Sequence, residues 1–147
     1  MKKHALYQVS LKVFLKNERG EVLILKAANG GSYEGFYDFP GGRIDESELE
    51  TPLVEIARRE IVEEVGNIEF TIKPAPVATG RHFLPSRSGN TAGNHVLYVF
   101  FEAQFNGGSI SISDEHLDHR WVKLEEVELE KHFISGLLEG AKMYLDR

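Results

Sequence analysis

The stretch REIVEEVG at residues 59–66 decides how this chain is interpreted. On an α-helix with about 3.6 residues per turn, Glu60, Glu63 and Glu64 stand at positions i, i+3 and i+4, so their carboxylates share one stripe of the surface. Arg59 lies four residues before Glu63, which is close enough for an ion pair. The neighbouring stripe is apolar and predicts packing against a sheet: Ala57, Ile61 and Val65.

Three carboxylates in one stripe repel one another, and each close pair costs up to roughly 4 kcal/mol near a protein surface. A divalent cation converts this repulsion into attraction, and an all-oxygen ligand set suits Mg²⁺ or Mn²⁺. Such a site binds a diphosphate and activates water. Because the same spacing is common on solvated helix faces, an acidic interaction surface remains an alternative. The context favours the metal site, since PGG at residues 40–42 and Glu48 precede the helix and Gly66 ends it.

Outside this helix, the sequence predicts a mixed β-sheet packed between helices. Residues 8–16 alternate in part, as a half-buried strand does, and residues 21–26 follow a turn as the hairpin partner. Residues 95–105 are apolar on both faces, which predicts a central strand covered on both sides. The other expected elements are helices at 52–65 and 132–145, extended segments at 68–72 and 77–83, a loop at 84–94 and a short strand near 121–122.

Length and composition predict a single domain of residues 1–147, because 41% hydrophobic residues are enough for a core. The absence of cysteine excludes disulfides, zinc–thiolate sites and cysteine nucleophiles. A formal charge of −6 argues against stable nucleic-acid binding and against binding to an anionic membrane. No signal peptide is visible, and no apolar run approaches the ~20 residues of a membrane span. A cytoplasmic location is therefore expected.

Residues 42–68 resemble the Nudix box, written GX5EX7REUXEEXGU with U an aliphatic residue, so the chain is similar to MutT-like Nudix hydrolases. Residues 49–51 read as a three-residue insertion before the helix, which leaves either Glu48 or Glu50 for the first acidic position. Asn67 stands at the final aliphatic position, and neither departure removes a metal ligand. The matching residues are Gly42, Glu48, Arg59, Glu60, Ile61, Glu63, Glu64 and Gly66.

The resemblance implies a fold of the α/β (α+β) class, an α/β/α sandwich around a central mixed β-sheet. It also implies a site for Mg²⁺, with Mn²⁺ as an alternative, and no organic cofactor. Among the catalytic residues, Arg59 is expected to orient a glutamate rather than to touch the substrate. The residues implied for the metal site are Glu60, Glu63, Glu64, Gly42 and Glu48.

The general base and the substrate contacts are less closely defined by the resemblance. Relatives often carry a further glutamate near the metals, and Glu115, just before the last expected strand, is the candidate for base or extra ligand. Glu63 or Glu64 is the alternative base. The substrate candidates are an aromatic residue at a position where many relatives carry tryptophan and two cations suited to phosphate oxygens: Tyr37, Arg81 and Lys26.

The implied reaction is hydrolysis of a diphosphate bond in a nucleoside diphosphate linked to another moiety. Nucleoside triphosphates, dinucleoside polyphosphates, ADP-ribose and nucleotide sugars all fit this description. The alternative is a catalytically inactive Nudix-fold module that senses a nucleotide, although such modules often lack metal glutamates and all three helical ones are present here. The expected partner is a small-molecule nucleotide, and a homodimer stays open because homodimers are frequent among such proteins.

Overall fold

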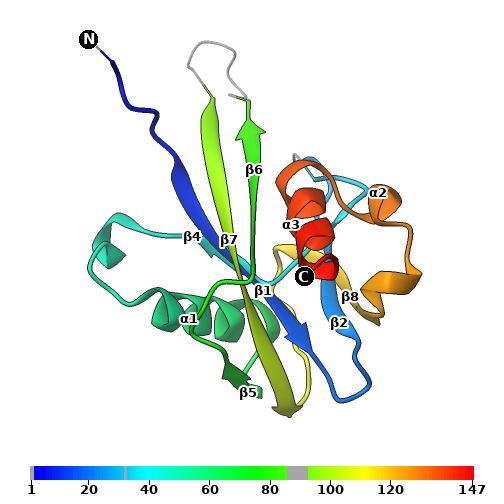
Figure 1. The fold of residues 1–147 in the computed structure, drawn as a ribbon. Coiled ribbons are helices and arrows are strands. Elements are labelled where there is room, and N and C mark those ends of the chain that lie inside the picture. The colour runs from blue at the N-terminus through cyan, green and yellow to red at the C-terminus, as the bar shows by residue number, and fades with distance from the viewer. Residues whose placement is uncertain (1, 32, 86–92) are drawn as a thin grey trace.

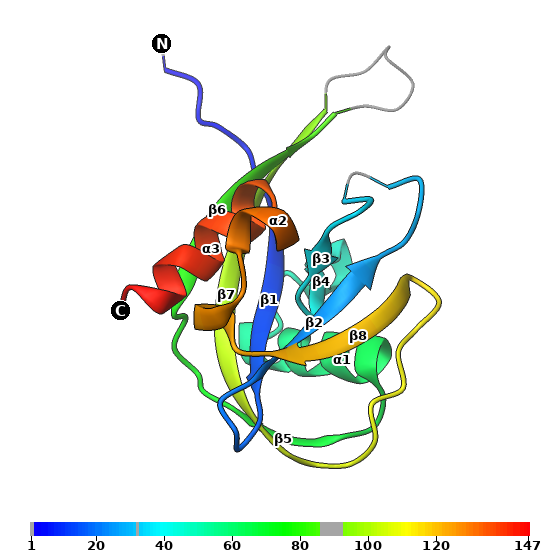
Figure 2. The same cartoon turned by 90° about the vertical axis from the view of Figure 1, so that its right-hand side faces the viewer.

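The computed structural model describes residues 2–31, 33–85 and 93–147, so most of the expected loop at 84–94 lies outside the described residues. The strands are β1 (Gln8–Lys16), β2 (Val22–Ala27), β3 (Tyr37–Asp38), β4 (Gly41–Arg43), β5 (Glu69–Ile72), β6 (Ala78–Leu84), β7 (Asn94–Gly107) and β8 (His116–Val122). The helices are α1 (Leu53–Val65), α2 (Leu129–His132) and α3 (Ser135–Leu145), with 3₁₀ helices η1 (Glu46–Glu48) and η2 (Leu124–Glu126). They form an α/β/α sandwich, with α1 and α3 on opposite sides of the sheet (Figures 1 and 2).

The sheet is mixed, and its centre is the pair of β1 and β7 (Figure 1). These two strands run parallel from Gln8 opposite Val96 to Lys16 opposite Gln104. The other edge of β7 pairs antiparallel with β6 and β5, and β1 also pairs antiparallel with β4 and with the start of β2. The expected mixed sheet and the expected central position of residues 95–105 are therefore confirmed.

Alternation along the two central strands divides the core into two layers, one on each face of the sheet. From β7, Tyr98 and Phe100 join the layer covered by α3, whereas Phe101 and Ala103 join the layer covered by α1. Helix α1 contributes its predicted apolar stripe to its own layer. The buried residues of that stripe are Ile56, Ala57, Ile61 and Val65.

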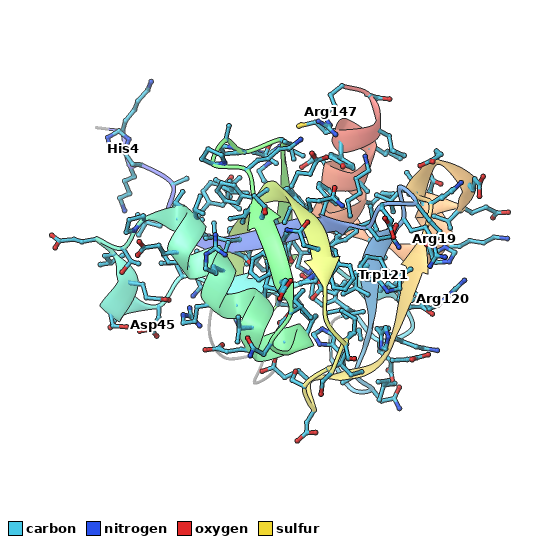
Figure 3. The ribbon with its side chains drawn as sticks, turned by 90° about the horizontal axis from the view of Figure 1, so that it is seen from below. His4, Arg19, Asp45, Arg120, Trp121 and Arg147 are labelled. Atoms are coloured by element: carbon cyan, nitrogen blue, oxygen red, sulfur yellow. The ribbon has the colours of Figure 1, made fainter. Side chains whose placement is uncertain are left out.

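The last third of the chain differs in two respects from the expectation. The single helix expected at 132–145 is two helices, because Phe133 and Ile134 are extended between α2 and α3. Phe133 is fully buried and stacks on Phe39 with 4.6 Å between ring centroids, so core packing interrupts the helix. The strand expected near Trp121 is longer and begins at His116; Trp121 itself packs against Phe105 (Figure 3).

Helix α3 approaches the sheet through glycines. A Cβ atom added at Gly80 on β6 would overlap the carbonyl oxygen of Gly136 on α3. A Cβ at Gly136 would meet the ring of Tyr98, and one at Gly140 would meet the ring of Phe100. We refer to Gly80, Gly136 and Gly140 as the glycine seam. Among the helices of the described chain, none is long and apolar enough to cross a membrane.

Candidate active site

Gly41 and Gly42 of β4 form a glycine corner that lies between β1 and α1. Gly41 has φ +143°, and a Cβ atom there would overlap the carbonyl oxygen of Leu11 on β1. At Gly42 a Cβ atom would overlap the carboxylate of Glu60 on α1. The two glycines are therefore required for close approach, and they bring the backbone of β4 against the acidic stripe of the helix.

The acidic stripe opens into a pocket of about 350 Å³ beside this corner. Glu115, from the loop before β8, lines the same pocket as the helix residues. The structure therefore brings together residues that the sequence analysis proposed from two distant segments. The acidic residues that line this carboxylate pocket are Glu60, Glu63, Glu64 and Glu115.

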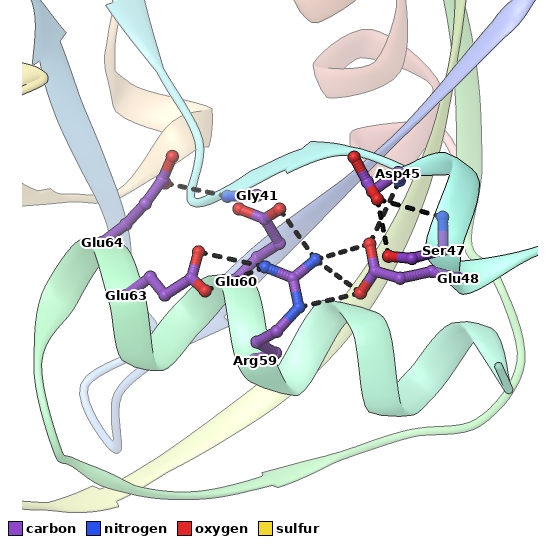
Figure 4. Close-up of polar contacts among 8 residues, drawn as sticks. All are labelled: Gly41, Asp45, Ser47, Glu48, Arg59, Glu60, Glu63 and Glu64. Carbon is purple, nitrogen blue, oxygen red and sulfur yellow. Dashed lines mark hydrogen bonds and ion pairs between the residues drawn. The ribbon is translucent and has the colours of Figure 1, made fainter.

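Arg59 is the centre of the ion pairs on the outer side of this pocket (Figure 4). Its guanidinium donates two hydrogen bonds to Glu48, at 2.8 and 2.7 Å, and two to Glu63, both at 3.0 Å. A further hydrogen bond of 3.2 Å reaches Glu60. The expected ion pair of Arg59 with Glu63 is present. Glu48 faces Arg59 while Glu50 is exposed, so the geometry favours Glu48 for the first acidic position of the box.

The three-residue insertion is accommodated before α1 begins. The backbone N–H of Asp45 donates to Glu48 Oε1 at 3.1 Å, and the N–H of Ser47 donates to Asp45 Oδ2 at 3.0 Å. This capping box fixes η1 and with it the position of Glu48 (Figure 4). Residues 49–51 follow as a turn, so the helical carboxylates keep their mutual spacing.

Glu64 differs from the other acidic residues of the carboxylate pocket because it is buried, with 6% of the residue exposed. Its Oε2 accepts a hydrogen bond of 2.9 Å from the N–H of Gly41. Burial raises the pKa of Glu64 to about 7, although Lys12 and the Gly41 N–H favour its charged form. Burial also raises the pKa of Glu60, and Arg59 partly offsets this effect.

The donor chemistry of the carboxylate pocket fits a hard divalent cation, because four of the side chains that line it are carboxylates. Gly42 leaves the space that the Glu60 carboxylate occupies. Within the described ranges, however, no three acidic or histidine side chains form a ready-made metal cluster. Glu63 turns toward Arg59 and Glu64 toward Gly41, so the carboxylates share a pocket without converging on one point.

A second pocket, of about 320 Å³, adjoins the first on the strand side of the glycine corner. Its polar floor is a buried ion pair in which Lys12 Nζ donates to Asp38 Oδ2 at 3.0 Å. Burial opposes the charge of each partner, yet Asp38 raises the pKa of Lys12, and Lys12 and His116 lower the pKa of Asp38. Both pockets are lined by Gly41, Gly42, Arg43, Glu64 and Glu115.

The sequence analysis did not single out Lys12 or Asp38. A visible signal existed for Lys12, because a lysine in the middle of the apolar strand at residues 8–16 needs a buried partner. Asp38 gave no such signal, since its position depends on the pairing of the two-residue strand β3 with β2. Arg43 was also missed, although it follows the glycine corner directly and lines both pockets.

The three substrate candidates from the sequence lie elsewhere. Tyr37 stacks on His132 with 5.6 Å between ring centroids, and Lys26 is its neighbour across the pairing of β2 and β3. Arg81 lines a different pocket on β6, where its backbone N–H donates to Glu139 at 2.9 Å. None of the three lines either pocket at the glycine corner as the described residues define it. Their substrate roles stay predictions.

Residues 6–138 match the NUDIX domain family. The chain belongs to this family. It is a MutT-like Nudix hydrolase, a pyrophosphohydrolase of a family whose members generally use divalent metal ions. Among curated relatives, the nucleoside triphosphatase NudI of Salmonella typhimurium is 29% identical over 117 residues, which cover 78% of this chain and 81% of the relative.

Solved Nudix structures share the fold. The MutT protein from Methanosarcina mazei Go1 superposes with a TM-score of 0.74 at 21% identity, over 99% of this chain and 95% of that one. A C. elegans Ap4A hydrolase has a TM-score of 0.60 at 22% identity, covering 81% and 82%. The NUDIX domain of Shewanella oneidensis NrtR, complexed with ADP ribose, has a TM-score of 0.64 at 14% identity, covering 97% and 86%.

Proposed function

We propose that this Nudix hydrolase cleaves a diphosphate bond of a nucleoside diphosphate derivative with the help of Mg²⁺, and that a nucleoside triphosphate is the first substrate to test. The observation that carries the proposal is the pair of adjoining pockets at the glycine corner. One pocket offers carboxylates for a metal-bound phosphate chain, and the other has the volume and mixed lining of a small-molecule site. The relative named as a nucleoside triphosphatase supports the choice of first substrate.

Glu60, Glu63 and Glu64, with Gly42 beside them, would hold the cation, and Mn²⁺ would suit the same oxygen ligands. When bound, Mg²⁺ neutralises phosphate charge and lowers the pKa of water. Arg59 holds Glu48 and Glu63 in place and acts as a positioning residue.

In the proposed reaction a water oxygen forms a bond to phosphorus, the bond from that phosphorus to the bridging oxygen breaks, and one water proton passes to a carboxylate. Glu64 is a candidate acceptor because its carboxylate lines both pockets at the corner where they meet. Glu115 is the alternative acceptor, since it also lines both pockets. Arg43 lies where the two pockets meet, and its guanidinium suits phosphate oxygens.

The test is a substrate screen with the purified protein in Mg²⁺, in Mn²⁺ and in chelator. The panel contains nucleoside triphosphates, dinucleoside polyphosphates, ADP-ribose and nucleotide sugars, and the products are separated to show which bond is cut. We expect metal-dependent release of a nucleoside monophosphate or of phosphate from at least one compound. Binding of a nucleotide without turnover in either metal would instead favour the inactive sensing module.

A further inference from the structure

The polar floor of the second pocket has no part in the proposed hydrolysis. Lys12 and Asp38 both line this pocket, and each is less than one-tenth exposed as a residue. A buried ion pair of this kind contributes little net stability compared with apolar residues, because desolvation offsets the attraction. Its position at the bottom of a pocket therefore suggests that it contacts a ligand.

Both partners of the ion pair retain hydrogen-bonding capacity. The three N–H groups of Lys12 have two protein acceptors here, Asp38 at 3.0 Å and the carbonyl of Phe39 at a long 3.4 Å. The Asp38 carboxylate accepts from Lys12 and from the N–H of Phe39 at 2.7 Å, which leaves lone pairs for a further donor. The floor thus presents one donor beside one acceptor.

His116 supplies a second, independent sign of a ligand site. Its side chain is 7% exposed and lines the same pocket, and its Nε2 lies 3.9 Å from Asp38 Oδ2. Its Nδ1 is buried without a hydrogen-bond partner among the described residues. Buried polar atoms are usually satisfied, so a bound molecule is a reasonable partner for this nitrogen.

We propose that Lys12 and Asp38 read the lactam edge of a keto nucleobase, with the base carbonyl accepting from Lys12 and the adjacent ring N–H donating to Asp38. Guanine, hypoxanthine, uracil and thymine share this carbonyl next to an N–H. Adenine and cytosine instead present an unprotonated ring nitrogen, which would face the Asp38 carboxylate without a proton between them. This proposal rests on the proposed function, because it takes the ligand to be a nucleotide.

The rest of the pocket fits a base in this orientation. Val96, Tyr98 and Leu84 provide apolar and aromatic walls for the faces of a planar ring. Lys12 Nζ lies 5.9 Å from the centroid of the Tyr98 ring, which helps to hold the ammonium group at the floor. A nucleotide bound here would extend its phosphates past Gly41 toward the carboxylate pocket, because the two pockets meet at that corner.

A purely structural ion pair would influence all nucleotides alike, so the test measures ratios between matched substrates. For the wild-type protein in Mg²⁺, kcat/KM is compared for GTP with ATP, UTP with CTP, and GTP with the triphosphate of 2-aminopurine riboside. We expect the keto member of each pair to be preferred at least about tenfold, because the wrong base leaves buried polar groups unpaired. Equal or better turnover of adenine and cytosine nucleotides would overturn the proposal.

Asp38→Asn provides the specific variant, because an amide offers a donor as well as an acceptor and can face an unprotonated ring nitrogen. The ratio of kcat/KM for GTP to kcat/KM for ATP should fall by at least about fivefold in this variant. The same decrease is expected in the charge-neutral double variant that combines Lys12→Gln with Asp38→Asn. The double variant guards against misfolding caused by an unpaired Lys12. Asp118→Asn, at an exposed position of β8, is the matched control and should keep the wild-type ratio. An unchanged ratio in both folded variants contradicts the proposal.

Calorimetric binding of the same nucleotides to the metal-free protein separates this inference from the proposed function. Preferential binding of keto nucleotides, with no hydrolysis of any of them in Mg²⁺ or in Mn²⁺, would support the base site and remove the enzymatic proposal. Hydrolysis with no preference among bases would do the opposite. Neither binding nor hydrolysis of any nucleotide would overturn both.

Discussion

Glu63 and Glu64 are consecutive residues of α1 and occupy opposite environments. The Glu63 side chain is 57% exposed and is held by Arg59, whereas Glu64 is buried and accepts from the backbone of Gly41. Glu63 belongs to an outer group of ion pairs that joins residues close in sequence. Glu64 belongs to an inner group with Gly41, and the position of this group depends on strand pairing and on the glycine corner. The difference shows that one short motif supplies residues to two environments with different electrostatics.

Of the substitutions that distinguish these two environments, replacement of the buried Glu64 should change the activity most. We expect Glu64→Gln to lower kcat/KM by about 10²–10⁴-fold, because it removes the buried carboxylate that we propose as a metal ligand and candidate proton acceptor. The variant should unfold at a temperature no lower than that of the wild type. Glu55→Gln, at an exposed position on the same helix, is the control. Near wild-type product release by Glu64→Gln would remove our assignment.

A second, smaller effect is the pH dependence of the free energy of unfolding in chelator-treated protein. The folded protein holds a proton on Glu64 up to about pH 7, whereas the ordinary pKa of the group is 4.5. The free energy of unfolding should therefore decrease as pH rises from about 4.5 to about 7, by roughly 2–3 kcal/mol from this group. Urea denaturation at several pH values measures it. If the free energy of unfolding has the same pH dependence in the wild type and in Glu64→Gln, burial does not raise the pKa of this carboxyl group.

Loss of Arg59 from the outer group of ion pairs should change the activity least. Arg59→Ala should lower kcat/KM by about tenfold, because Glu63 and Glu48 lose the guanidinium that orients them. Stability should change by no more than about 1 kcal/mol, as is usual for partly exposed ion pairs. Arg59→Lys should recover only part of the activity, since an ammonium group cannot reproduce the forked contacts. Rates equal to those of the wild type would show that the outer ion pairs are unimportant.

The features that were predicted correctly depend on local sequence patterns. The spacing of Glu60, Glu63 and Glu64 and the ion pair of Arg59 follow from the helical repeat of 3.6 residues, and the central strand at 95–105 follows from a run that is apolar on both faces. Strands β3 and β4 were not predicted, because segments of two and three residues have no periodicity and exist only through pairing with β2 and β1.

The candidate site was predictable to a similar extent. Glu115 was expected near the helix from its place before the last strand, and it does line the carboxylate pocket. The pocket floor was not foreseen, since Asp38 reaches Lys12 across 26 residues of sequence. Tyr37 was chosen because it stands where many relatives carry tryptophan, and Lys26 was chosen for its charge. Neither criterion indicates toward which face of the sheet a side chain points.

The glycine seam has a consequence for how this fold tolerates change. Because α3 lies directly against the backbone of β6 at Gly80 and against the rings of Tyr98 and Phe100 on β7, the spacing between these layers has no slack at the glycine seam. An alanine at Gly136 would displace either the helix or Tyr98, which also forms a wall of the second pocket. A substitution on α3, which contributes no residue to the carboxylate pocket, would in this way reshape the cavity where we place the base.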